Sequence, residues 1–214
     1  HIREPLQSFR PTILLTSDHS SYLERIDWLE LNTYRSSQPL LIGLTASLAE
    51  YGNSRLEQRL AEAKSRTINF YYTFRDQNYV QSRPEYRPFF EQNYSILSLP
   101  FGANISCYYP LAHITRDLNY VLIATRKREH DAYLWPLARH YSGFLGGPGW
   151  SHSAGFVFHP DRDRYFYARA KIGLNVHLPE QLEWASELNE RTYQLAACGT
   201  PQLIDHPKLL DAVF

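Results

Sequence analysis

The sequence predicts an α/β protein with two parallel sheets covered by helices. Short apolar runs of strand length alternate with longer amphipathic stretches along the 214 residues, and this alternation is typical of parallel strands joined by helical crossovers. A segment without clear periodicity, 100–118, separates two such series. No internal repeat or low-complexity tract interrupts either series. We therefore expect two Rossmann-like halves.

Eight apolar runs are expected to form the buried strands, because each has the length and apolar character of a strand in a parallel sheet. They cover 13–15, 40–44, 68–74, 96–99, 120–124, 143–145, 172–176 and 203–204.

Helical periodicity appears between these runs. In the clearest pattern Leu56, Leu60 and Ala63 form an apolar stripe, and Ser54 with Glu57 three residues later forms a capping box. The other helical patterns cover 22–34, 84–92, 129–140, 162–171 and 190–198.

Charge and composition exclude several classes of protein. The chain has 22 Lys+Arg and 22 Asp+Glu, so no overall field attracts nucleic acid and no nucleic-acid partner is expected. A hydrophobic fraction of 43% argues against disorder. Cys107 and Cys198 form no disulfide framework, which predicts a reducing, cytoplasmic compartment. No apolar run has the length of an integral membrane segment, and no signal-peptide pattern appears.

The chain is expected to divide into an N-terminal part, 1–115, and a C-terminal part, 116–214. Sheets of this kind bind ligands beyond the carboxyl ends of their strands, so the loops after strands are where functional residues are expected. The chain has no methionine and begins with His1. The simplest interpretation is an internal piece of a longer protein, truncated at both ends.

The most informative segment for function is the helix expected over 190–198. Asn189 can cap this helix, and Gly199 can end it. The free amides of its first turn lie beside Arg191 and Thr192, a favourable place for a phosphate. The same features fit a packing helix with a solvated Arg191, and spacing alone favours that simpler interpretation.

Two further loops contain candidate binding residues. Arg126 and Lys127 follow the fifth expected strand and suit a diphosphate, although a solvated basic run fits equally well. Gly146 and Gly147 open a turn through which a backbone can approach a ligand, with Trp150 available for stacking. An ordinary turn with a core Trp is the alternative. The turn is no GxGxxG fingerprint, so a nicotinamide dehydrogenase is unsupported.

Two acidic motifs have weaker interpretations. Asp18 and His19 follow the first expected strand, where they could act as a general base and its orienting partner; capping of the next helix by Asp18 explains the pair equally well. Asp161 and Asp163 resemble an Asp-x-Asp metal motif, but a helical pattern begins at once and helix capping is the better explanation. The histidines lack zinc-site spacing, so no metal site is expected.

The run 189–202, NERTYQLAACGTPQ, resembles the donor-site helix of GT-B glycosyltransferases, and the closest subgroup is the CgeB-like, "family 1" group. The run 170–177 is similar to that group's strand before the donor loop, and 146–150 is similar to its glycine-and-tryptophan turn. The resemblance covers most of 118–214, whereas the first half matches only loosely.

This resemblance implies a GT-B-like enzyme that moves a sugar from a nucleotide-sugar donor, bound between two Rossmann-like domains, to an acceptor. By position, Arg191 and Thr192 would hold the leaving diphosphate without a metal, with Arg126 or Lys127 on the opposite wall. Gln194 stands where the family places a glutamate that holds the donor ribose, so donor affinity or identity is expected to differ. No cofactor is implied, because the nucleotide sugar is a co-substrate.

The remaining expectations concern the acceptor and the alternatives. Asp18 and His19 would deprotonate or orient the acceptor hydroxyl, and the acceptor is a glycan, a lipid, a protein or a small molecule. The first alternative is a catalytically silent module that binds a nucleotide or sugar phosphate, which Gln194 favours. The second is a tyrosine-rich protein-interaction domain, which predicts no nucleotide binding.

Overall fold

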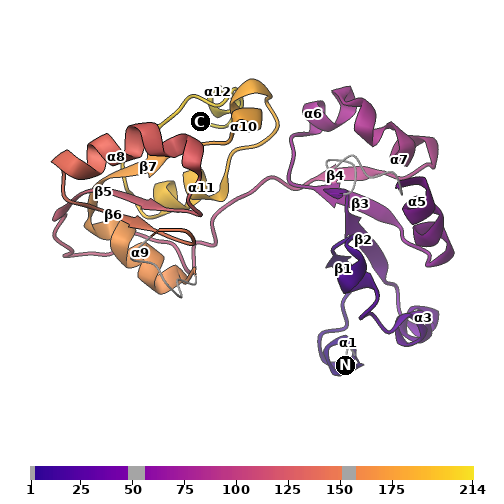
Figure 1. Ribbon diagram of the computed structural model, residues 1–214. Coiled ribbons are helices and arrows are strands. Elements are labelled where there is room, and N and C mark those ends of the chain that lie inside the picture. Colours follow the sequence, from indigo (N-terminus) through magenta and orange to yellow (C-terminus); the bar gives the residue numbers. More distant parts are fainter. Residues whose placement is uncertain (1–2, 48–55, 151–157) are drawn as a thin grey trace. The chain divides into compact units, whose positions relative to one another are not determined.

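The computed structural model describes residues 3–47, 56–150 and 158–214 (Figure 1). The chain divides into two compact units, 1–100 and 101–214. The division falls at the start of the aperiodic segment, ahead of the boundary expected after residue 115. Each unit contains one four-stranded parallel sheet with helices packed on it, which confirms the expected α/β fold with two Rossmann-like halves.

The first sheet has its strands in chain order, β1-β2-β3-β4, and all of its pairings are parallel. Its strands are β1 (Ile13–Thr16), β2 (Leu41–Thr45), β3 (Phe70–Thr73) and β4 (Ile96–Ser98). The helices are α1 (Arg3–Phe9), α2 (Ser20–Leu23), α3 (Trp28–Ser37), α5 (Leu56–Ser65), α6 (Gln77–Ser82), η1 (Pro84–Tyr86) and α7 (Arg87–Glu91). Because parallel crossovers are right-handed, strands that advance in one direction place their connecting helices on one face.

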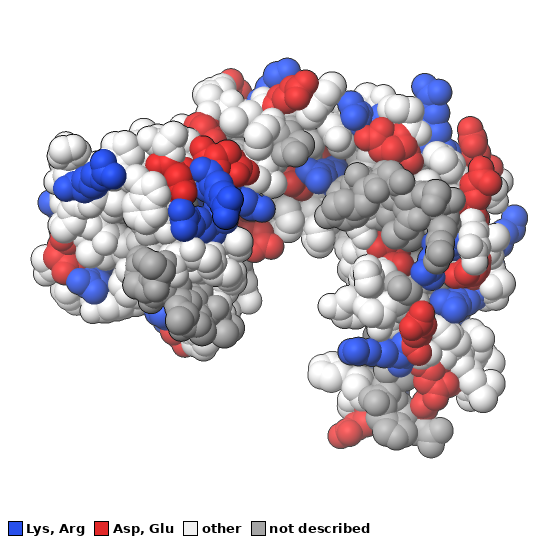
Figure 2. All heavy atoms as spheres, in the orientation of Figure 1, with Lys and Arg blue, Asp and Glu red and all other residues white. Residues whose placement is uncertain are grey.

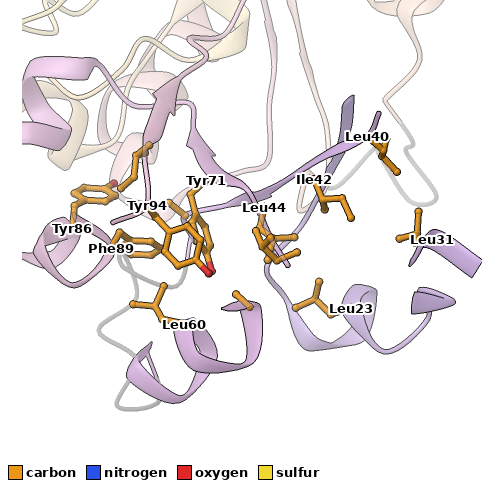
Figure 3. Packing of buried hydrophobic residues seen from close by; sticks show 14 of the residues in the cluster. Leu23, Leu31, Leu40, Ile42, Leu44, Leu60, Tyr71, Tyr86, Phe89 and Tyr94 are labelled. Carbon is orange, nitrogen blue, oxygen red and sulfur yellow. The ribbon is translucent and has the colours of Figure 1, made fainter. Parts of the chain in front are cut away.

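One face of the first sheet therefore contains the core of this unit. Ile42, Leu44 and Tyr71 point from the strands toward Leu23 and Leu60 of the helices (Figure 3). The opposite face carries apolar side chains that the described helices leave exposed. They are Ile13, Leu15, Leu41 and Leu97, at 53%, 46%, 48% and 45% exposure.

The second sheet has the order β6-β5-β7-β8, again entirely parallel. Its strands are β5 (Leu118–Ile123), β6 (Gly143–Gly146), β7 (Ala170–Asn175) and β8 (Gln202–Ile204). The helices are η2 (Arg128–His130), α8 (Asp131–His140), α9 (Pro160–Arg169), α10 (Pro179–Glu183), α11 (Glu190–Ala197) and α12 (Leu210–Val213). The chain runs outward from β5 to β6 and returns to β7 on the other side of β5, so the direction of winding reverses between β5 and β7.

Helices cover both faces of the second sheet, with α8 on one face and α9 on the other (Figure 1). The alternation of β5 explains this arrangement, because neighbouring residues of a strand point to opposite faces. Tyr120 and Leu122 belong to the core on the α8 side. Val121 and Ile123 belong to the core that Tyr167 of α9 and Leu195 of α11 complete.

All eight expected strands are present, with ends shifted by a few residues. The helix expected over 22–34 is wrong as one element: α2 ends at Leu23, and α3 begins after Asp27, whose side chain caps it. The helix expected over 162–171 ends at Arg169, because β7 begins at the next residue, Ala170. Ser54 of the expected capping box lies outside the described residues.

The surface has no dominant charge on the face that Figure 2 shows, where Lys and Arg are interspersed with Asp and Glu. Within the described ranges, no helix is long and apolar enough to cross a bilayer.

Candidate functional site

The candidate site is a cavity of about 590 Å³ in the second unit. Ile123 and Thr125 line it at the carboxyl end of β5, Val176 lines it just beyond β7, and Arg191 lines it from α11. The cavity thus lies where the winding of the sheet reverses, the position at which open α/β sheets bind their ligands. Its volume is typical of small-molecule pockets.

The first turn of α11 presents unused donors at this cavity. The side chain of Asn189 accepts the amide N–H of Thr192 at 3.1 Å, which confirms the expected N-cap. The amides of Glu190 and Arg191 have no acceptor in the described part of the chain. Together with the positive end of the helix, these amides form a place that favours an anion.

Arg191 bridges the ends of the two central strands. Its Nε donates to the Ile123 carbonyl at 3.2 Å, and its Nη1 donates to the Val176 carbonyl at 3.3 Å and to Asn175 Oδ1 at 3.4 Å. Burial lowers the pKa of the guanidinium, and nearby Tyr167 and Asp205 only partly oppose this shift.

Arg191 has no counter-ion within the part of the chain that the structure describes. It forms no ion pair with a described carboxylate, and no described group accepts a hydrogen bond from its Nη2. A half-buried cation in this state is stabilised by any anion that enters the cavity.

The two basic residues after β5 have different surroundings. Lys127 lines the cavity and forms no ion pair with a described residue. Arg126 donates through Nε to Asp131 at 3.2 Å and makes a second, shorter contact through Nη2. Its guanidinium also lies over the rings of Trp135 and Trp150, at 5.4 and 5.8 Å from their centroids. Arg126 is therefore engaged within its own unit.

The glycine turn after β6 holds the end of β5. The Gly146 carbonyl accepts the amide of Ala124 at 2.8 Å. Gly147 has a φ of 128°, and a Cβ at this position would lie 2.1 Å from the Ala124 carbonyl oxygen. The indole of Trp150 donates to the same oxygen at 3.0 Å and also lines the cavity. This close packing places the turn beside the site.

The side chain of Thr192 points into the protein interior, whereas that of Gln194 points into the cavity. Thr192 is buried, and its Oγ1 accepts from Asn175 Nδ2 at 2.8 Å. Gln194 lines the cavity, and its Oε1 accepts from the hydroxyl of Tyr167 at 3.4 Å. The amide nitrogen of Gln194 is thereby left to donate to a ligand.

Asp18 and His19 belong to the first unit. Asp18 is buried after β1, and its carboxylate accepts from Thr45 Oγ1 at 2.6 Å and, more closely, from Ser47 Oγ. His19 is exposed, and its Nδ1 lies 2.8 Å from Ser21 Oγ. Asp18 thus ties together the loops that follow β1 and β2.

The interpretation of Asp161 and Asp163 as capping residues is wrong in detail. The N-cap of α9 is His159, and both aspartates lie in the first turn. Asp163 is buried and accepts the His159 amide at 3.2 Å, which supports the helix start from inside the helix. Burial raises the pKa of Asp163, although Arg162 partly opposes this effect. Asp163 also lines the cavity.

Several residues of the site lie outside the candidate binding motifs of the sequence. Tyr108, His130 and Gln181 line the cavity, and His177 lies buried beneath α11. The position of His177 just beyond the end of β7 was the available signal, whereas Gln181 lies within α10. In the described ranges, no three His, Cys, Asp or Glu side chains form a group suited to a metal ion.

Comparison with known proteins finds a similarity, and it lies in the second unit. Residues 120–214 match a family model described as glycosyl transferase-like. The match covers the sequence from within β5 to α12, and so includes both central strands and α11. None of the curated proteins matches the chain.

Proposed function

We propose that the protein transfers a sugar from a nucleotide-sugar donor to an acceptor, and the match of residues 120–214 to a glycosyl transferase-like family supports this proposal. In this proposal Arg191 and the first turn of α11 hold the donor diphosphate. Glycosyl transfer in general requires a sugar donor and an acceptor, and the two phosphate groups of a nucleotide-sugar donor are its anionic part.

The observation that carries the proposal is that no described residue supplies a counter-ion to Arg191. The guanidinium is held at the ends of β5 and β7 by carbonyl groups, which orient it without neutralising it. A diphosphate beside Nη2 would supply the negative charge, and the free amides of Glu190 and Arg191 would add two donors. Negative charge that develops on the departing phosphate would then be stabilised electrostatically by preorganised groups.

Lys127 and Gln194 complete the proposed donor site. Lys127 supplies a second cation that lines the same cavity. The side-chain amide of Gln194 would donate a hydrogen bond to an oxygen or nitrogen atom of the ribose or base of the nucleotide sugar. The charge of the diphosphate is assigned to Arg191 and Lys127, so we expect a chelator of divalent ions to leave transfer unchanged.

Asp18 and His19 remain the proposed base for the acceptor. The imidazole of His19 is exposed and has Nε2 available for a hydroxyl group, since Nδ1 lies beside Ser21 Oγ, and buried Asp18 holds the loop that carries it. Full transfer activity after His19→Ala would eliminate this role.

Lys127 and Arg126 are expected to respond differently to replacement by Ala. Lys127→Ala removes from the cavity a cation that has no ion pair among the described residues, so we expect about fivefold to tenfold weaker binding of nucleoside diphosphate with little change in stability. Arg126→Ala breaks the contacts to Asp131 and to two Trp rings, so we expect a lower urea midpoint of unfolding and nearly unchanged binding. Isothermal titration and urea unfolding measure the two effects, and the reverse pattern would exchange the proposed roles.

A thermal shift measurement tests the proposed function. The chain is heated with UDP, GDP, ADP, CDP or dTDP and with the corresponding nucleotide sugars. A ligand at 100 times its dissociation constant adds about 2.7 kcal/mol of stability, which corresponds to a rise of about 5–10 °C for a chain of this size. No shift with any of these compounds would contradict the donor site. Selective binding without transfer or donor hydrolysis would instead identify a silent binding module.

A further inference from the structure

We propose that Asp205, His177 and Thr192 are positioning residues that set the orientation of Arg191 without touching the donor themselves. The inference rests on the proposed function, because the orientation of Arg191 matters only if an anion binds there. Its evidence is a buried chain of hydrogen bonds that starts beyond β8 and ends at the guanidinium.

The chain begins with the carboxylate of Asp205, which holds His177 at two points. One oxygen accepts the His177 amide at 2.7 Å, and the other lies 2.6 Å from its Nδ1. The imidazole is fully buried. A carboxylate at Nδ1 holds the Nδ1–H form of the ring, which leaves Nε2 directed at the next group. The loops after β7 and β8 are thereby joined.

Thr192 connects this pair to the start of α11. Its Oγ1 lies 3.4 Å from His177 Nε2 and 3.2 Å from Asn189 Oδ1. Asn189 Oδ1 is also the atom that caps the helix by accepting the Thr192 amide. The hydroxyl has one hydrogen and donates it to only one of these two acceptors at a time. Donation to Nε2 completes the chain from Asp205, and Oγ1 still accepts from Asn175.

Asn175 carries the effect from Thr192 to Arg191. Its Nδ2 donates to Thr192 Oγ1 at 2.8 Å and to Gln202 Oε1 at 3.0 Å. Because both acceptors hold the amide nitrogen, the oxygen of Asn175 must face Nη1 of Arg191, at 3.4 Å. A rotated amide would instead present N–H groups to the guanidinium and displace it.

The consequence concerns which edge of the guanidinium faces the cavity. Asn175 and the Val176 carbonyl engage Nη1, and the Ile123 carbonyl engages Nε. Nη2 is thus left as the donor for a phosphate oxygen. Loss of the Thr192 hydroxyl removes the shorter of the two contacts that hold the amide nitrogen of Asn175 and leaves only the contact to Gln202, so the orientation of Arg191 is less firmly fixed.

The first test compares three threonine variants by isothermal titration with the tightest-binding of the five nucleoside diphosphates. Thr192→Val keeps the shape of the side chain and removes the hydroxyl, and we expect about tenfold weaker binding. Thr192→Ser restores the hydroxyl and is expected to bind within about twofold of the parent protein. Thr200→Val is the matched control, because Thr200 is also buried and its hydroxyl donates to the Tyr167 carbonyl at 3.0 Å. We expect Thr200→Val to be less stable than the parent protein but to bind the diphosphate with an affinity within about twofold of the parent protein's.

The second test needs no ligand. Hydrogen exchange at the Nε–H of Arg191, which donates to Ile123, is followed by NMR, and Arg191→Lys identifies the signal. We expect at least tenfold faster exchange in Thr192→Val and in Asp205→Asn, and no change in Thr200→Val. Asp205 is partly exposed, at 25% of its side chain, so its variant remains available if Thr192→Val does not fold.

The outcomes separate the two proposals. Faster exchange in Thr192→Val together with weaker binding supports both. Faster exchange in a protein that binds none of the diphosphates supports the positioning role and contradicts the proposed function. Unchanged exchange in both variants overturns the positioning role, whatever happens to binding.

Discussion

Arg191→Ala is expected to weaken binding of the nucleoside diphosphate by about 100-fold. The variant removes the cation that has no described counter-ion, and a charge-assisted contact to phosphate is among the strongest single contacts in a binding site. The two carbonyl groups that held the guanidinium then face the cavity and repel the phosphates. Isothermal titration with the diphosphate identified by thermal shift measures the loss.

Two further variants control this experiment. Arg139→Ala removes an exposed arginine from the last turn of α8, which lies at the opposite end of the strands from the cavity because α8 begins near the end of β5. Its binding is expected to match the parent protein. Arg191→Lys keeps the charge but cannot contact Ile123 and Val176 together, so we expect at least tenfold weaker binding. Equal affinity of Arg191→Ala and Arg139→Ala would remove Arg191 from the donor site.

Gly147→Ala is expected to destabilise the second unit by about 3 kcal/mol or more. The φ of 128° is unfavourable for any residue with a Cβ, and the added methyl group would lie 2.1 Å from the Ala124 carbonyl oxygen. Relief requires movement of the backbone at the end of β5, where Trp150 also donates to Ala124. Urea unfolding monitored by circular dichroism measures the loss.

Gly102→Ala is the matched control for this variant. No atom lies within 4 Å of a Cβ built at Gly102, so the substitution is expected to change stability by less than about 1 kcal/mol. Because Gly147 holds the loop beside the cavity, we also expect Gly147→Ala to bind diphosphate more weakly under conditions where it is folded. Equal stability of the two variants would show that the turn adapts without cost.

Much of the fold could be predicted because its signals are local. Apolar runs of strand length predicted all eight strands, and the capping chemistry of Asn189 predicted the start of α11. The helix expected over 22–34 failed for a local reason as well. Asp27 accepts the amide of Glu30 at 3.0 Å and begins a new helix there, although the apolar periodicity continues across it.

The candidate site was less predictable, even between neighbouring residues. Arg126 and Lys127 form one basic run in the sequence. Lys127 has an extended backbone, with φ −116° and ψ 130°, and neighbours along an extended segment point in opposite directions. Arg126 consequently meets Asp131 and two Trp rings, whereas Lys127 lines the cavity. Only the surrounding packing distinguishes the two.

The sequence by itself determined the strands, the capped helix with Arg191 in its first turn, and the resemblance of that helix to a glycosyltransferase donor site. The tertiary structure decided which atoms face Arg191. The Ile123 carbonyl is 68 residues away in the chain, and Asp205 meets His177 across 28 residues. Such contacts depend on the order β6-β5-β7-β8, which brings the ends of β5 and β7 together. Local periodicity specifies each strand but carries no information about its neighbours, so the setting of Arg191, without a counter-ion among the described residues, emerges only from the assembled sheet.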